Sequence, residues 1–142
     1  MQNFENHARV DPVFHRILVP LLLLTFIGAC VNFGKSLGDH ERLYSASLIL
    51  VLSLCLILTT FLARIFPLRA QDRAIRAEES LRHYVLTGKL LDPRLTVRQV
   101  VALRFASDGE FVALAAHAVE KSLPPKEIKK AIKNWRADDY RV

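Results

Sequence analysis

Hydrophobic and polar positions are segregated along the 142-residue chain into two uncharged apolar stretches and a charged remainder. The apolar stretches cover residues 17–34 and 43–63, which contain no Asp, Glu, Lys or Arg. Their lengths, 18 and 21 residues, bracket the roughly 20 residues that a helix needs to cross a bilayer. Backbone polar groups inside hydrocarbon must bond within their own segment, so each stretch is predicted to be a transmembrane helix.

Residues 35–42, between the two stretches, contain Gly38 and several charged side chains, which is typical of a turn. A turn this short predicts an antiparallel pair, a transmembrane hairpin over residues 17–66. The alternative is a helical hairpin in a soluble core. A short chain has too little other protein to bury two helices that are apolar on all sides, which disfavours that alternative.

The distribution of basic residues predicts which side of the membrane each end faces. The turn has only Lys35 and Arg42, whereas four arginines follow the second stretch: Arg64, Arg69, Arg73 and Arg76. We therefore expect a cytoplasmic N-terminal segment (residues 1–16), an external turn and a cytoplasmic C-terminal region (residues 67–142). The first three of those arginines are candidates for contact with lipid headgroups: Arg64, Arg69 and Arg73.

The C-terminal region is predicted to be helical, beginning after Pro67. A 4-3-4-3 spacing places five apolar side chains on one face of its first helix: Ala70, Ala74, Ala77, Leu81 and Tyr84. Such a stripe indicates packing against another helix of the chain or a coiled-coil-like dimer seam, and the spacing leaves both open. Glu78 and Arg82 are expected to pair at i,i+4, and the helix is expected to stop at Thr87 and Gly88.

Three shorter helices are expected after this point. Thr96 with Gln99, and Ser107 with Glu110, fit capping boxes that begin two of them. Pro125 suits the first position of the last helix. In that helix one face should be buried, and it carries Ile128, Ala131, Ile132 and Trp135.

The opposite face of the last helix is basic, with Lys126, Lys129, Lys130 and Lys133. A charge run of this kind is often only a solvated face. Four lysines on one face nevertheless repel each other, which favours a role in binding an anionic lipid surface, an acidic protein or nucleic acid. We take these lysines, together with Arg104 and Arg136, as candidate partner contacts. Nucleic acid is the less favoured partner, since Asn134 is the only amide available to read bases.

The sequence offers no candidate for catalysis or for metal binding. The five histidines lack the spacing of a metal site, and the two cysteines, Cys30 and Cys55, fall in the apolar stretches. We therefore expect a non-enzymatic protein that uses no cofactor.

The chain resembles a family of small bacterial membrane proteins catalogued as domain of unknown function 6526. The residues that carry the likeness are QNF at 2–4, NH at 6–7, QDR at 71–73, LRFASD at 103–108 and KEIKKAIKNWR at 126–136. In that family a serine commonly precedes the proline of the last helix, whereas this chain has Pro124 there. The resemblance implies a bacterial inner (cytoplasmic) membrane protein but no activity.

These observations predict an all-α protein, with a transmembrane hairpin followed by a small cytoplasmic helical region. The expected function is that of a membrane-tethered interaction module or accessory subunit of a membrane complex, whose partner is another protein or a second copy. The alternative is a membrane-anchored nucleic-acid-binding protein that uses the lysines of the last helix.

Overall fold

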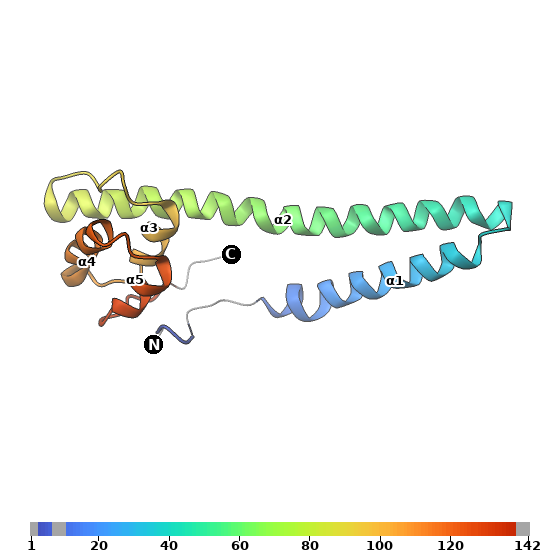
Figure 1. The fold of residues 1–142 in the computed structure, drawn as a ribbon, viewed down its shortest axis with the longest axis horizontal. Coiled ribbons are helices and arrows are strands. Elements are labelled where there is room, and N and C mark those ends of the chain that lie inside the picture. The colour runs from blue at the N-terminus through green and yellow to red at the C-terminus, as the bar shows by residue number, and fades with distance from the viewer. Residues whose placement is uncertain (1–2, 7–10, 139–142) are drawn as a thin grey trace. The chain divides into compact units, whose positions relative to one another are not determined.

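The computed structural model describes residues 3–6 and 11–138, and these fold into helices without a β-strand. The predicted all-α class is therefore confirmed. Six helical elements are described (Figure 1): the π-helix η1 (Val13–Leu18), α1 (Val19–Lys35), α2 (His40–Thr87), α3 (Val97–Leu103), α4 (Asp108–Glu120) and α5 (Pro125–Ala131). Part of the expected N-terminal segment, residues 1–2 and 7–10, lies outside the described residues.

The chain divides into two compact units. Val10–Phe66 forms the first, here called the apolar unit. Met1–Arg9 together with Pro67–Val142 forms the second, here called the packed unit. Helix α2 contributes residues 40–66 to the apolar unit and residues 67–87 to the packed unit.

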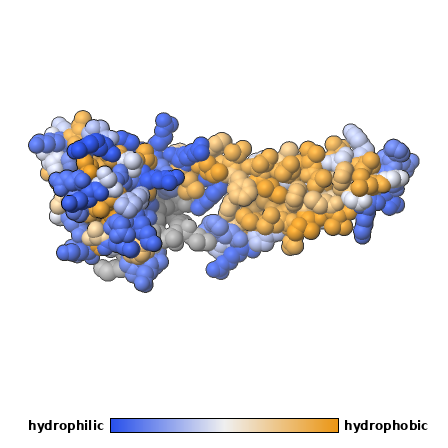
Figure 2. Space-filling view, viewed as in Figure 1, coloured by the Kyte–Doolittle hydropathy of each residue, from blue (hydrophilic) through white to orange (hydrophobic). Residues whose placement is uncertain are grey.

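Two helical stretches, Val13–Lys35 and His40–Thr87, are long and apolar enough to cross a membrane. Only 6% and 11% of their most apolar windows are buried within the protein. The core helix of a soluble protein would be mostly buried, so the fold of this chain does not use either stretch in that way. Figure 2 shows apolar side chains over the visible face of the apolar unit, with hydrophilic ones where α1 passes into α2.

The few buried side chains of the apolar unit are small. They are Ala29, Ser36, Ala46 and Ser53. Hydroxyl groups in the apolar helices donate to carbonyl oxygens of their own helix, as Ser53 Oγ does to Leu50 (2.7 Å) and Thr60 Oγ1 does to Leu56 (2.8 Å). These bonds satisfy the hydroxyls without a partner from outside the helix.

The turn between α1 and α2 covers residues 36–39 and is shorter than the predicted 35–42. Asp39 accounts for the difference. Its Oδ1 accepts from the backbone N–H groups of Glu41 and Arg42 at 3.2 and 3.3 Å. A carboxylate that caps these first donors lets α2 begin at His40, ahead of its first apolar residue. Gly38 has φ +125°, a conformation that favours glycine.

Pro67 does not interrupt the helix, so the expected restart after it was wrong: α2 is one 48-residue helix with Pro67 inside. An interior proline costs about 3 kcal/mol because it removes one hydrogen bond and crowds the preceding turn. The residues after it, from Leu68 to Thr87, are mostly good helix formers and offset that cost. The helix ends at Thr87, as predicted, and Gly88 follows with φ +69°.

The packed unit has a core of large side chains. Those buried to within 2% of their surface are Phe105, Phe111, Leu95, Leu103, Ile128 and Val100. Helix α3 packs against both α4 and α5. The predicted capping box at its start is confirmed, because Thr96 Oγ1 accepts from the Gln99 backbone and Gln99 Oε1 accepts from the Thr96 backbone.

The second predicted capping box is wrong. Ser107 precedes α4 but makes no side-chain cap bond. The carboxylate of Glu110 instead accepts from the backbone N–H groups of Lys133 and Asn134, at 3.3 and 2.9 Å. Those donors follow α5 in the chain and have no helical partner, so Glu110 stabilises a distant loop and not its own helix.

Helix α5 begins at Pro125 as predicted, with Pro124 as a cap that lacks a side-chain bond. It ends at Ala131, well before Trp135. The chain beyond it pairs with the segment after α3: Ala106 and Trp135 form an isolated antiparallel bridge, and the Arg136 N–H donates to Phe105 O at 2.7 Å. Ile128 and Ile132 are buried as expected, whereas Ala131 is exposed.

Helix α2 turns a different face to this core than the alanine stripe predicts. Ile75 and Glu79 are its buried residues in the packed unit. The stripe itself is exposed at all five positions, Ala70, Ala74, Ala77, Leu81 and Tyr84. The expectation that this stripe packs against another helix of the same chain is therefore wrong, and the dimer seam is the interpretation that the structure leaves open.

Candidate interaction surface

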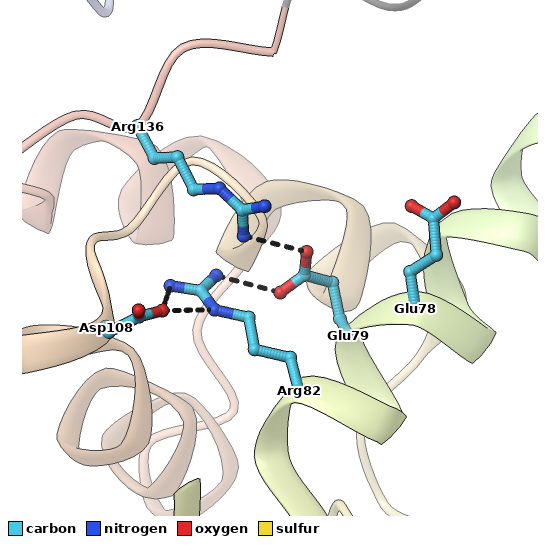
Figure 3. Close-up of a pocket in the computed structure, with 5 residues that line it drawn as sticks. All are labelled: Glu78, Glu79, Arg82, Asp108 and Arg136. Carbon is cyan, nitrogen blue, oxygen red and sulfur yellow. Dashed lines mark hydrogen bonds and ion pairs between the residues drawn. The ribbon is translucent and has the colours of Figure 1, made fainter. Parts of the chain in front are cut away.

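A cluster of charged side chains joins three segments of the packed unit that are distant in sequence (Figure 3). Helix α2 contributes Glu79 and Arg82, α4 begins with Asp108, and Arg136 follows α5. Arg82 lies between two carboxylates. Its Nη1 donates to Glu79 Oε2 at 2.9 Å, and its Nε donates to Asp108 Oδ1 at 2.7 Å. Arg136 Nη1 lies 3.9 Å from the other oxygen of Glu79.

Arg82 is the centre of the cluster. Its side chain is only 11% exposed, and its Nη2 also donates to the carbonyl oxygen of Ala106 at 2.8 Å. The guanidinium carbon lies 4.4 Å from the centre of the Phe111 ring, which is in range for a cation–π contact. The Arg82 side chain thus hydrogen-bonds both α4 and the segment before it, and it also covers the buried ring of Phe111 on α4.

The cluster borders an open cavity of about 460 Å³ lined by Glu78, Glu79, Arg82, Asp108 and Arg136. Figure 3 shows Glu78 one step along α2, without a bond to the others. The lining consists of carboxylate and guanidinium groups and has no hydroxyl, thiol or imidazole. Since carboxylates already neutralise Arg82, the arrangement serves to hold helices together.

The structure separates the six basic residues that the sequence groups as partner contacts. Arg104 is 11% exposed at its side chain, pairs with Asp138 (Nε–Oδ2 2.7 Å) and lies over the Phe105 ring. Lys129 Nζ lies 5.5 Å from the centre of the same ring. Both cations therefore take part in the packing of the unit around Phe105, which leaves less of each for a partner.

The other four are exposed. Lys126 and Lys130 lie on α5, and Lys130 Nζ pairs with Glu127 Oε1 at 3.1 Å. Lys133 lies beyond the end of α5, so the four lysines do not share one helix. Arg136 has a side chain that is more than half exposed, and its ion pair with Glu79 is long at 3.9 Å. These four residues form the basic surface that the structure makes accessible: Lys126, Lys130, Lys133 and Arg136.

The arginines proposed for lipid headgroups lie on α2. Arg64 belongs to the apolar unit, where its guanidinium carbon lies 5.6 Å from the Phe14 ring centre. Arg69 and Arg73 belong to the packed unit, and both are exposed.

Sequence reasoning missed Glu79, and it predicted the wrong partners for Glu110 and Arg82. The expected i,i+4 pair of Glu78 with Arg82 is replaced by the i,i+3 pair with Glu79. A usable signal exists for Glu79, because Ile75 and Glu79 are four residues apart and share a helix face. The local capping-box spacing marked Glu110 but not its partners, which come from 23 and 24 residues further along.

Comparison with known families gives a match over the whole chain. The model of a family described as a family of unknown function, DUF6526, matches residues 1–142. No curated protein and no solved structure matches the chain.

Proposed function

The chain belongs to the family of unknown function DUF6526, as the resemblance predicts, and we propose that it is a non-enzymatic, membrane-tethered interaction module. In this proposal α1 and the first half of α2 form a transmembrane hairpin in a bacterial inner membrane. The packed unit lies in the cytoplasm as a platform for a protein partner, a second copy or a larger membrane complex to which the chain is an accessory subunit.

The observation that carries the proposal is the nearly unburied state of the two apolar stretches, 6% and 11% within the chain. An apolar surface of this extent is stable only in a non-aqueous environment or under a partner. A signal sequence explains only the first stretch, because the second begins at His40 and continues into the packed unit. Small buried residues such as Ala29 and Ala46 support close helix packing within a bilayer.

Site-specific labelling in intact cells tests both the anchoring and the topology. Cys30 and Cys55 are first replaced by serine, and one cysteine is then introduced at Leu37 in the turn or at Lys89 after α2. Both positions are exposed. We expect a membrane-impermeant maleimide to label Leu37→Cys in intact cells and Lys89→Cys only after lysis, with both proteins retained in alkali-washed membranes. Loss from washed membranes overturns the anchoring, and the reverse labelling pattern overturns the orientation.

Nucleic acid is the second candidate partner, and the exposed Lys126, Lys130 and Lys133 favour it. It ranks lower because Lys129 and Arg104 lie against the Phe105 ring. Duplex DNA titrated into the purified full chain at near-physiological salt separates the candidates. A Kd well below the ordinary non-specific range of about 10⁻⁶ to 10⁻⁴ M makes nucleic acid the partner. Binding within or above that range leaves the interaction module as the better proposal.

A further inference from the structure

Helix α2 carries an exposed apolar face within the packed unit. Leu81 is 65% exposed, Val85 is 75% exposed and Tyr84 is 52% exposed. The buried residues of α2 in the packed unit, Ile75 and Glu79, are other positions of the helix. Three large apolar side chains this exposed on one helical segment mark a contact surface.

The face has the register of a two-stranded coiled coil. Ala74, Ala77, Leu81 and Tyr84 alternate in steps of three and four residues, which places them at the a and d positions of two heptads. Val85 follows at e. The face begins with two alanines and ends with Leu81 and Tyr84. A second copy of α2, packed alongside in register, would match small side chains with small ones and large with large.

Two charged residues flank the face with opposite signs. Arg73 is at a g position and Glu78 is at the following e position, five residues later, and both are exposed. In a parallel two-stranded coiled coil, a g residue meets the e residue of the partner's next heptad, which is five residues further along. Two copies of α2 in register therefore place Arg73 of each beside Glu78 of the other.

We propose that a second copy of this chain covers this face, in a parallel α2–α2 pair centred on Leu81 with Arg73–Glu78 contacts on both sides. The pairing rests on the proposed membrane anchoring for its orientation, because two chains anchored in one membrane present α2 in the same direction. Two heptads are short for a stable pair in solution, and confinement to a membrane raises the effective concentration. Lipid is not the occupant, since Leu81 lies 18 residues beyond Ala63, the end of the uncharged stretch, which is about 27 Å along a helix.

Disulfide trapping of the full chain in membranes tests the seam, on the background in which Cys30 and Cys55 are serine. We expect Leu81→Cys and Ala74→Cys each to give a major cross-linked dimer on mild oxidation. Leu86→Cys is the matched control, a leucine on the same helix at an f position, and should give little. Trapping at both 74 and 81 requires a parallel pair, because an antiparallel pair centred on Leu81 separates its two Ala74 residues by about 20 Å.

Charge reversal tests the recognition. Arg73→Glu alone and Glu78→Arg alone should each weaken self-association by about tenfold, since like charges then face each other on both sides. Mixing the two variants should restore trapping between them. Equal trapping at 81 and 86 in washed membranes overturns the seam and leaves the membrane anchoring intact. Selective trapping at 81 in protein lost from washed membranes keeps the seam and overturns the anchoring.

Discussion

The two units of this protein bury opposite kinds of side chain. In the apolar unit the buried residues are small, as Ala29, Ala46 and Ser53 are, while the large apolar residues face outward. In the packed unit the buried residues are large, with Phe105 and Phe111 in the core. A core of large apolar groups forms because water expels them. Where the surroundings are themselves apolar, that force is absent, and helices associate through close contact of small residues.

Charged side chains follow the same division. In the packed unit Glu79 is almost completely buried and is compensated by Arg82 and Arg136. Helix α2 has no charge to compensate between residues 43 and 63. A buried ion pair has well-defined partners, so it fixes which face of α2 meets the core of the packed unit. In the apolar unit the buried side chains that meet are small and uncharged, so close fit selects those contacts.

Phe111→Ala should give the largest effect. This side chain is fully buried and carries the Arg82 guanidinium over its ring. Its truncation leaves a cavity and should lower the free energy of unfolding of the packed unit by about 3–5 kcal/mol. Fluorescence of Trp135, the only tryptophan, reports this unit directly, because its ring lies 5.1 Å from that of Phe105. Denaturant titration of the full chain in detergent micelles measures the change.

The matched control is Phe61→Ala in the apolar unit, where the phenylalanine faces outward. It should leave the Trp135 transition within about 0.5 kcal/mol of the parent. Equal losses of unfolding free energy from Phe111→Ala and Phe61→Ala would show that the same interactions stabilise both units.

The features that the sequence predicted correctly are those decided by interactions between residues close together in the chain. The apolar stretches, the Thr96–Gln99 capping box and the start of α5 at Pro125 each depend on residues within a few positions, and the structure has all of them. The end of α5 was wrong by several residues. The segment at Trp135 leaves the helix to pair with Ala106, a partner 29 residues earlier that no helical period reveals.

The charged cluster shows the same limit at the candidate site. Periodicity placed α2 correctly as a helix but could not decide whether the alanine face packs in a core or in a seam, because alanines suit either. The buried face is decided by Arg82, which finds Asp108 and the carbonyl of Ala106 only once α4 is in place. Likewise Arg104 appears as a surface cation in the sequence, and only the fold brings Asp138 to it.

Arg82→Met tests how much the buried ion pair contributes to the stability of the packed unit. The change keeps an apolar stem but removes the close partner of the buried Glu79 carboxylate, which among the described residues keeps the long contact to Arg136. We expect the packed unit to lose about 2–3 kcal/mol, since an uncompensated buried charge is costly. Adding Glu79→Gln should recover part of this loss. Arg76→Met, at an exposed position of the same helix, should change the Trp135 transition little. A loss as large from Arg76→Met would contradict the role given to Arg82.

Ala46→Leu tests the small contacts of the apolar unit. Ala46 is 1% exposed, and the added volume should force the neighbouring helices apart at a cost of about 1–2 kcal/mol. The helical signal in circular dichroism during SDS titration of the full chain measures this change. Ala63→Leu adds the same volume at an exposed position of α2 and should be near neutral. Stabilisation by Ala46→Leu would mean that apolar burial, and not close contact, holds this unit together.

The smallest expected effect concerns pH and the turn that leads into the core of the packed unit. Arg94 hydrogen-bonds to the carboxylate of Asp92, with Nη2–Oδ2 at 2.8 Å, and lowers the pKa of Asp92 below its ordinary 3.8.

A carboxyl whose pKa is lower in the folded state contributes stability above its unfolded pKa, and loses it as the pH falls through the folded value. At pH 6 the free energy of unfolding of the parent protein should therefore be slightly higher than that of Asp92→Asn. The difference between the two proteins should shrink below about pH 4. Because the Arg94 side chain is exposed and that of Asp92 is partly exposed, high salt should also shrink the difference. The Trp135 transition of both proteins across this pH range is the measurement. A difference that is unchanged down to pH 3 would show that the turn is held by its backbone bond from Leu95 to Asp92 and not by the ion pair.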